Sequence, residues 1–130
     1  MKVGAYNLQE ILIGLVIIGI LVLLALPNLM PLISKAKSTE AQLQLSHIHN
    51  LQTTYFYMYS RYSTDFEDID FEPPKTVSEE GRSNYKYEIL SATNNTFKAQ
   101  ATAITDFDGD GTYNVWEIDQ NGAPKEIIKD

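Results

Sequence analysis

An uninterrupted apolar run at residues 11–26, ILIGLVIIGILVLLAL, constrains this chain more than any other feature. The sequence after residue 34 is by contrast mixed and acidic. Sixteen helical residues measure about 24 Å, slightly short of a hydrocarbon layer of ~30 Å. Leu8 and residues 27–33 extend the run to a transmembrane span. We expect an apolar helical segment at residues 6–33 and one soluble domain at residues 34–130.

The overall composition excludes several classes of function. The formal net charge is −7 and the basic residues are scattered, so the chain lacks the basic surface that nucleic-acid binding needs. It has no cysteine, which excludes disulfides, thiolate metal sites and cysteine nucleophiles. No His-Asp-Ser, zinc or phosphate-loop pattern is present, so we do not expect an enzyme.

The order of features near the N-terminus is the reverse of that in a secretory signal. Such a signal has its small-residue cleavage site after the apolar stretch. Here the basic Lys2 and the small residues Gly4 and Ala5 precede the run. Cleavage at this place would remove residues 1–5 as a leader and leave the apolar segment on the mature chain.

Glu10 lies at the upstream edge of the apolar run. A carboxylate within lipid costs roughly 2–3 kcal/mol unless it has a partner. One interpretation places Glu10 at the headgroup boundary, where water solvates it. In the other, cleavage after Ala5 creates an amino terminus at Tyr6, one helical turn from Glu10, and the carboxylate pairs with this amine or with that of an adjacent subunit.

These residues resemble the start of the type IV pilin and pseudopilin family. Members have a short basic leader, which here contains Lys2, and a cleavage site, which here follows Ala5. Their first mature residue is aromatic, as Tyr6 is, and a Thr-Leu-Ile-Glu-like stretch comes next, here residues 7–10. Pro27 falls where the family often has a helix-kinking proline, and residues 34–37 are also similar. The resemblance is specific over about the first 35 residues.

The resemblance implies a processing and assembly route. A prepilin peptidase would cut between Ala5 and Tyr6 and N-methylate Tyr6, and an ATPase-driven machine would extract subunits from the inner membrane into a homo-oligomeric helical filament. Glu10 would be the assembly carboxylate. The chain departs from the family in having Ala5 where glycine is usual and Tyr6 for phenylalanine. A cut after Gly4, or an uncleaved signal anchor, remains an alternative.

Residues beyond the apolar run predict a helix that packs on a sheet. Pro27 and Pro31 should kink or locally unwind it. The two histidines, His47 and His49, are interpreted as surface residues. Apolar positions that recur at helical spacing predict the packed face: Ala41, Leu45, Ile48, Leu51, Tyr55 and Met58.

Alternating patterns in the C-terminal half predict antiparallel strands. One begins near Tyr85, a second near Phe97 after an Asn-Asn turn, a third covers residues 112–119, and residues 126–128 follow an Asn-Gly turn. The expected fold class is α+β, of the type IV pilin fold. Its long N-terminal helix has an exposed apolar half and an amphipathic half packed on a three- to four-stranded antiparallel sheet.

An aspartate-rich segment at residues 106–111, DFDGDG, matches the start of a calcium loop. Its carboxylates would repel one another unless a hard cation is present. We expect calcium to be bound by Asp106, Asp108 and Asp110, completed by Asn114 or a backbone carbonyl. The following residues read as a strand, which carries Glu117 away and argues against a complete EF-hand. A glycine-rich turn without metal is the alternative.

The predicted function is a structural subunit of a type IV pilus-like filament. The precursor would be a single-pass inner-membrane protein, and the assembled filament would be extracellular. A pseudopilin of a type II secretion system, with a periplasmic filament, is one alternative, although its usual segment rich in tryptophan, glycine and tyrosine is absent. A membrane-anchored calcium-binding module that does not polymerise is another.

Overall fold

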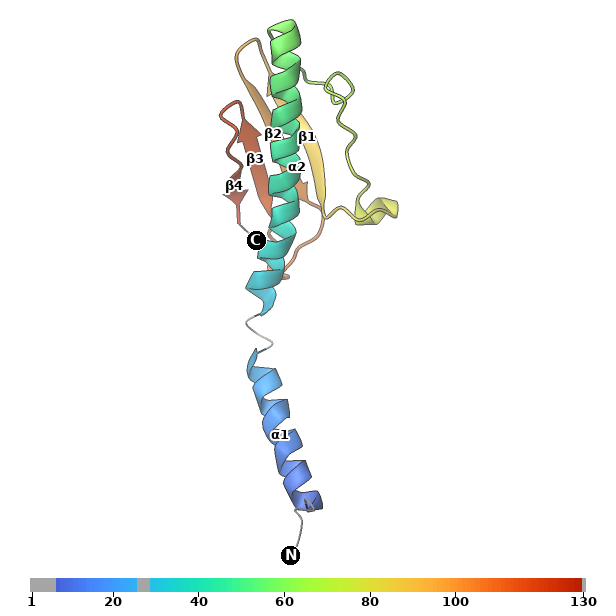
Figure 1. Cartoon of the computed structure of the whole chain (residues 1–130), viewed down its shortest axis with the longest axis vertical. Coiled ribbons are helices and arrows are strands. Elements are labelled where there is room, and N and C mark those ends of the chain that lie inside the picture. The colour runs from blue at the N-terminus through green and yellow to red at the C-terminus, as the bar shows by residue number, and fades with distance from the viewer. Residues whose placement is uncertain (1–6, 26–28, 130) are drawn as a thin grey trace, which may run out of the picture. The chain divides into compact units, whose positions relative to one another are not determined.

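The structure is a computed structural model that describes residues 7–25 and 29–129. The chain divides into two compact units, Met1–Ile33 and Ser34–Asp130, and each is described by itself. In these described residues, two long helices, a short 3-10 helix and four strands follow one another (Figure 1). The second helix begins in the first unit and supplies the helical layer of the second.

Helix α1, Leu8–Ala25, accounts for the described apolar segment. Asn7 directly precedes the helix, and its carbonyl oxygen accepts hydrogen bonds from the backbone N–H groups of Glu10 (3.0 Å) and Ile11 (3.3 Å). Leucine, isoleucine and valine fill most of the helix. Within the described residues, no helix is both long and apolar enough to cross a membrane.

Helix α2 covers Leu29–Tyr59. Pro31 is its third residue, where the missing N–H costs no helical hydrogen bond because the first-turn donors have no partner within a helix. Pro27, the other residue of the predicted kink, lies outside the described residues.

The inner face of α2 is the one expected from its periodicity, except near its end. Ala41, Leu45, Ile48 and Tyr55 are buried, and Leu51 packs against the same core. The prediction for Met58 was wrong, because its side chain is 65% exposed. The chain leaves the helix shortly afterwards, and the N–H of Tyr62 already bonds to Thr93 at the turn that ends the first strand. The last turn of α2 thus lies beyond the buried face.

The sheet is a four-stranded antiparallel meander in the order β1-β2-β3-β4. Its strands are Tyr85–Ala92, Phe97–Ala103, Val115–Asp119 and Lys125–Ile128. Figure 1 shows α2 lying along one face of this sheet. The structure confirms the predicted α+β architecture.

The small residues of β2 allow the helix to approach the sheet closely. Ala99 and Ala101 are completely buried and lie opposite Ile118 and Trp116 on β3. The four side chains share one face because partners in an antiparallel register point to the same side. This face and the buried residues of α2 belong to one hydrophobic core.

Strand β3 begins at Val115, three residues later than the predicted start at Thr112. The N–H of Thr112 is held by the Asp110 carboxylate at 2.8 Å, so the local turn prevents the strand from starting there.

The prediction of a surface position was wrong for His49, which is half-buried. Its Nε2 lies 3.2 Å from the carbonyl oxygen of Gln120.

The connector, residues 60–84, joins α2 to β1. It contains a turn at residues 66–70 and the 3-10 helix η2, Val77–Glu79. Gln52 of α2 fastens it: the Gln52 Nε2 donates to the Ser63 carbonyl oxygen at 2.7 Å, and its Oε1 accepts from the Ser63 N–H at 3.0 Å. Both residues are buried, so this pair satisfies polar groups that would otherwise be unpaired within the core.

Candidate functional site

The apolar surface of α1 is the largest unusual feature of the first unit. Leu15, Val16, Ile17 and Ile18 are between 52% and 60% exposed. Consecutive residues of a helix are about 100° apart, so four of them surround its axis. All sides of α1 therefore present apolar side chains. Such a surface needs lipid or other helices around it.

Glu10 is the single charged residue in the described part of α1. It lies in the first turn, where the partial positive charge of the helix N-terminus favours a carboxylate. Its side chain is exposed and is thus available to a group from outside α1. The predicted cleavage residues, Ala5 and Tyr6, lie outside the described residues.

The aspartate loop, residues 106–112, brings three predicted ligands together. Carboxylate oxygens of Asp106, Asp108 and Asp110 all lie within 4.8 Å of one another. Gly109 and Gly111 have positive φ angles of 77° and 85°, which glycine adopts without steric cost. The two glycines let the chain curl so that alternate side chains converge.

Backbone donors also point into the aspartate loop. Asp106 accepts hydrogen bonds from the N–H groups of Gly109, at 2.9 Å, and Gly111. Asp108 accepts one from the N–H of Asp110 at 3.1 Å. Desolvation acts to raise the pKa of Asp106, but the hydrogen bonds from Gly111, Gly109 and Asp108 together lower the pKa. The loop therefore favours the ionised form that a cation would require.

Phe107 attaches the aspartate loop to the rest of the second unit. Its ring lies 5.8 Å from that of Tyr85 on β1, in an edge-on arrangement. The Lys37 ammonium of α2 lies 4.8 Å from the Phe107 ring centre, within the range of a cation–π interaction. Phe107 thus anchors the loop between a strand and a helix, while residues 108–111 are exposed.

Asn114, the fourth predicted ligand, is engaged elsewhere. Its Oδ1 accepts hydrogen bonds from the Tyr85 hydroxyl at 2.6 Å and from the Trp116 indole N–H at 2.7 Å. Its Nδ2 donates to Glu126 at 3.0 Å and to the Ile128 carbonyl oxygen at 2.8 Å. The buried Asn114 therefore links β1, β3 and β4, and the structure does not bring its side chain to the three aspartates.

Glu40 of α2 is an important polar residue that sequence reasoning missed. Its carboxylate accepts hydrogen bonds from the Ser83 hydroxyl at 3.0 Å, the Asn84 N–H at 3.2 Å and the Tyr87 hydroxyl at 3.2 Å. Burial raises the pKa of Tyr87, and the charge of Glu40 raises it further. Glu40 thus holds α2 against the end of the connector and the start of β1.

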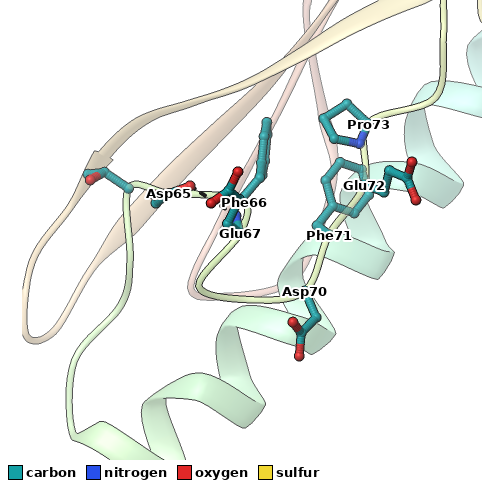
Figure 2. A pocket seen from close by; sticks show the side chains of 8 residues that line it. Asp65, Phe66, Glu67, Asp70, Phe71, Glu72 and Pro73 are labelled. Atoms are coloured by element: carbon teal, nitrogen blue, oxygen red, sulfur yellow. Dashed lines mark hydrogen bonds between the residues drawn. The ribbon is translucent and has the colours of Figure 1, made fainter.

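The connector also forms an open surface hollow of about 940 Å³, lined by residues 64–67 and 70–73. The rings of Phe66 and Phe71 meet there with centroids 4.9 Å apart. Figure 2 shows the labelled carboxylates spread around the hollow instead of converging on one point. Phe71 belongs to the hydrophobic core. We read the hollow as the outer side of that core, edged by acidic residues.

One long helix on an antiparallel meander, preceded by an all-round apolar helix, defines a pilin-like class of protein. No family model matches the chain. It is 31% identical to the type IV major pilin protein PilA of Myxococcus xanthus over 87 residues, which are 67% of this chain and 37% of the relative. The chain thus matches little more than a third of the relative's length. It is a type IV pilin-like protein with the α+β fold of that family.

Proposed function

We propose that the chain is a structural subunit of a type IV pilus-like filament whose copies pack through α1. The observation that carries the proposal is the exposure of apolar side chains on every side of α1. Burying a leucine or isoleucine side chain fully contributes about 1.5–3 kcal/mol. A bundle of neighbouring α1 helices would bury many of them at once, and this would stabilise a filament core.

Before assembly, the same apolar surface would hold the precursor in the inner membrane. The reversed order of basic residue, small residues and apolar run supports a leader that is cut between Ala5 and Tyr6. Prepilin peptidase would then methylate Tyr6, and a membrane machine would move the subunit into the filament. The peptidase and the membrane machine are proposed because the first 35 residues resemble those of type IV pilins.

Glu10 would guide the entry of each subunit into the filament. The support is its position as the single charge of α1, exposed in the first turn. Among apolar neighbours an unpaired carboxylate is costly, whereas a carboxylate paired with an amine is much less so. Pairing with the amine of a neighbouring Tyr6 would therefore fix the register of adjacent helices.

An extracellular pilus is favoured over a periplasmic secretion pseudopilus. The relative is named a major pilin, and the chain lacks the segment rich in tryptophan, glycine and tyrosine noted above. The structural role proposed here requires no catalytic group.

The test is immunogold electron microscopy of cells that produce the chain, compared with the variants Ile17→Asp and Ile127→Asp. The two isoleucines are similarly exposed, at 52% and 50%, but only Ile17 belongs to α1. We expect regular labelling along filaments for the wild type and for Ile127→Asp, and membrane-associated subunits without filaments for Ile17→Asp. Absence of labelled filaments from wild-type cells would overturn the proposal.

We also propose that the aspartate loop binds calcium, a property compatible with either kind of filament or with a tethered monomer. The specific support is the convergence of three carboxylates within 4.8 Å. Calcium prefers carboxylate and carbonyl oxygens in flexible geometry. Asp106, Asp108 and Asp110 would hold the ion, which would offset their mutual repulsion.

A further inference from the structure

The hollow of the connector combines an apolar floor with an acidic edge. Phe66 and Phe71 line it together with Pro73, and its volume is about 940 Å³. Ligand sites of proteins have volumes of about 300–1,000 Å³ and are lined mainly by apolar and aromatic side chains. Phe66 is only half-buried, so part of its ring remains accessible to a ligand.

Three carboxylates at the edge of the hollow take no part in the described fold. Glu67, Asp70 and Glu72 line the hollow and are exposed. Within residues 7–25 and 29–129, no hydrogen bond or ion pair engages these side chains. The described lining also contains no basic residue. The lining therefore carries negative charge that its own residues do not offset.

The arrangement of these carboxylates indicates the chemistry of a ligand. Figure 2 shows them separated around the two aromatic rings. Calcium needs oxygen ligands that converge on one point, so separated carboxylates fit a ligand with several positive charges instead. Arginine suits both parts of the hollow, because its planar guanidinium pairs with carboxylates in bidentate fashion and stacks on aromatic rings.

The chain itself is a poor source of such a ligand. Its two arginines, Arg61 and Arg82, both belong to the connector. Between residues 60 and 84 the connector has seven acidic and three basic residues. A second copy that offered either arginine would bring further negative charge to the hollow, and like charges repel. Charge complementarity thus favours a different, basic protein.

We propose that the hollow binds an arginine-containing peptide segment of such a protein. Guanidinium groups pair with Glu67, Asp70 and Glu72, and one of them stacks on Phe66. The apolar floor excludes water from one side of these pairs, which strengthens their attraction. This binding goes beyond the structural role proposed above and does not depend on filament formation.

The first test measures binding of a fluorescent tetra-arginine peptide to the full-length chain extracted in detergent. Glu67→Gln with Asp70→Asn removes two charges from the hollow, and asparagine tolerates the positive φ of 57° at residue 70. Glu79→Gln with Glu80→Gln removes two exposed charges of the same connector outside the hollow. We expect Kd to rise at least about fivefold for the first double variant and to stay within about twofold for the second.

Thermal melting of the same samples separates loss of the site from misfolding. All four positions are exposed, so both double variants should melt like the wild type. An equal rise of Kd in both would show that binding follows net charge alone and would overturn the inference. A wild-type chain that does not bind the peptide, or an unchanged Kd for the first double variant, would also overturn it and leave the proposed filament intact.

The second test checks that arginine is the occupant. Citrulline has the shape of arginine without its charge, and lysine has the charge without the planar group. We expect the peptide with citrulline to bind at least about tenfold more weakly and the peptide with lysine about threefold more weakly. Phe66→Leu, which keeps an apolar side chain, should remove the difference between arginine and lysine. Equal binding of the arginine and lysine peptides by the wild type, or a difference that survives Phe66→Leu, would overturn the assignment.

Discussion

The Tyr87 hydroxyl on β1 donates a hydrogen bond to the Glu40 carboxylate on α2 across 3.2 Å. Residues 47 positions apart thus join the helix to the sheet through a neutral phenol and an acid. Burial, followed by the charge of Glu40, raises the pKa of Tyr87 above its ordinary value of 10.0. The phenol therefore keeps its proton in the folded state.

This raised pKa predicts a loss of stability at alkaline pH. The folded state holds its proton above pH 10, where the unfolded tyrosine loses it, so the contribution of Tyr87 is complete below about pH 10 and decreases as pH rises further. We expect Tyr87→Phe to reduce the alkaline slope of unfolding free energy by about 0.7 kcal/mol per pH unit at pH 10, where half of the unfolded tyrosine is ionised, and by about 1.4 kcal/mol per pH unit well above pH 10. Urea titrations of a Ser34–Asp130 fragment between pH 9 and 11 measure this slope.

Tyr57→Phe is the control, since Tyr57 is 80% exposed and should leave the slope unchanged. An identical slope for the wild type and Tyr87→Phe would contradict the assignment of this linkage to Tyr87.

The role of Asn114 leads to a prediction about the last strand. Asn114→Asp keeps the oxygen that accepts from Tyr85 and Trp116 but removes the amide donor and sets a carboxylate against that of Glu126. Leaving such groups unpaired costs about 1–3 kcal/mol. We expect hydrogen exchange of the β4 amides to accelerate while β1 and β2 stay protected. Asn95→Asp, in an exposed turn, should leave β4 unaffected, and equal protection in both variants would refute the linking role.

Calcium should stabilise the second unit if the aspartate loop binds it. Binding to the folded form alone at a hundredfold excess over Kd raises stability by about 2.7 kcal/mol. Chelation should therefore lower the melting temperature of the Ser34–Asp130 fragment, and combined Asp108→Ala and Asp110→Ala should abolish that response while the sheet stays folded. If chelation has no effect and calorimetry detects no binding at millimolar calcium, the loop is an ordinary acidic turn.

Glu10→Gln tests the assembly role of the carboxylate without changing its size. The neutral side chain should insert and be cleaved normally, because the apolar run is intact. Filament yield should fall at least about tenfold, since the pairing with a neighbour's amine is lost. The measurement compares sheared filaments with membrane-bound subunits. An unchanged yield, or a subunit that fails to insert, would argue against this role.

The periodic parts of the second unit were predictable from the sequence because they depend on local geometry. Alternation placed Phe97, Ala99 and Ala101 on one buried face of β2, and helical spacing identified Ala41 and Leu45 as core residues. Each pattern repeats over several turns or residue pairs, so the sequence itself specifies the buried side.

Features that depend on distant partners were not predictable. Gln52 is buried because Ser63 returns to it, and Glu40 acts through Ser83 and Asn84, 43 and 44 residues away. Met58 fits the helical pattern, but periodicity does not reveal where the supporting core ends. The aspartate spacing identified the three converging carboxylates. The neighbouring Asn114 instead forms hydrogen bonds with Tyr85 and Glu126, which the spacing does not reveal.

The most direct test of the central claim is mass spectrometry of filaments sheared from cells that produce this chain. The account predicts that the chain is a principal polypeptide of the filaments, with residues 1–5 absent and an N-methylated Tyr6 as its first residue. Filaments that lack this chain, or a chain found only in membranes with Met1 intact, would contradict it.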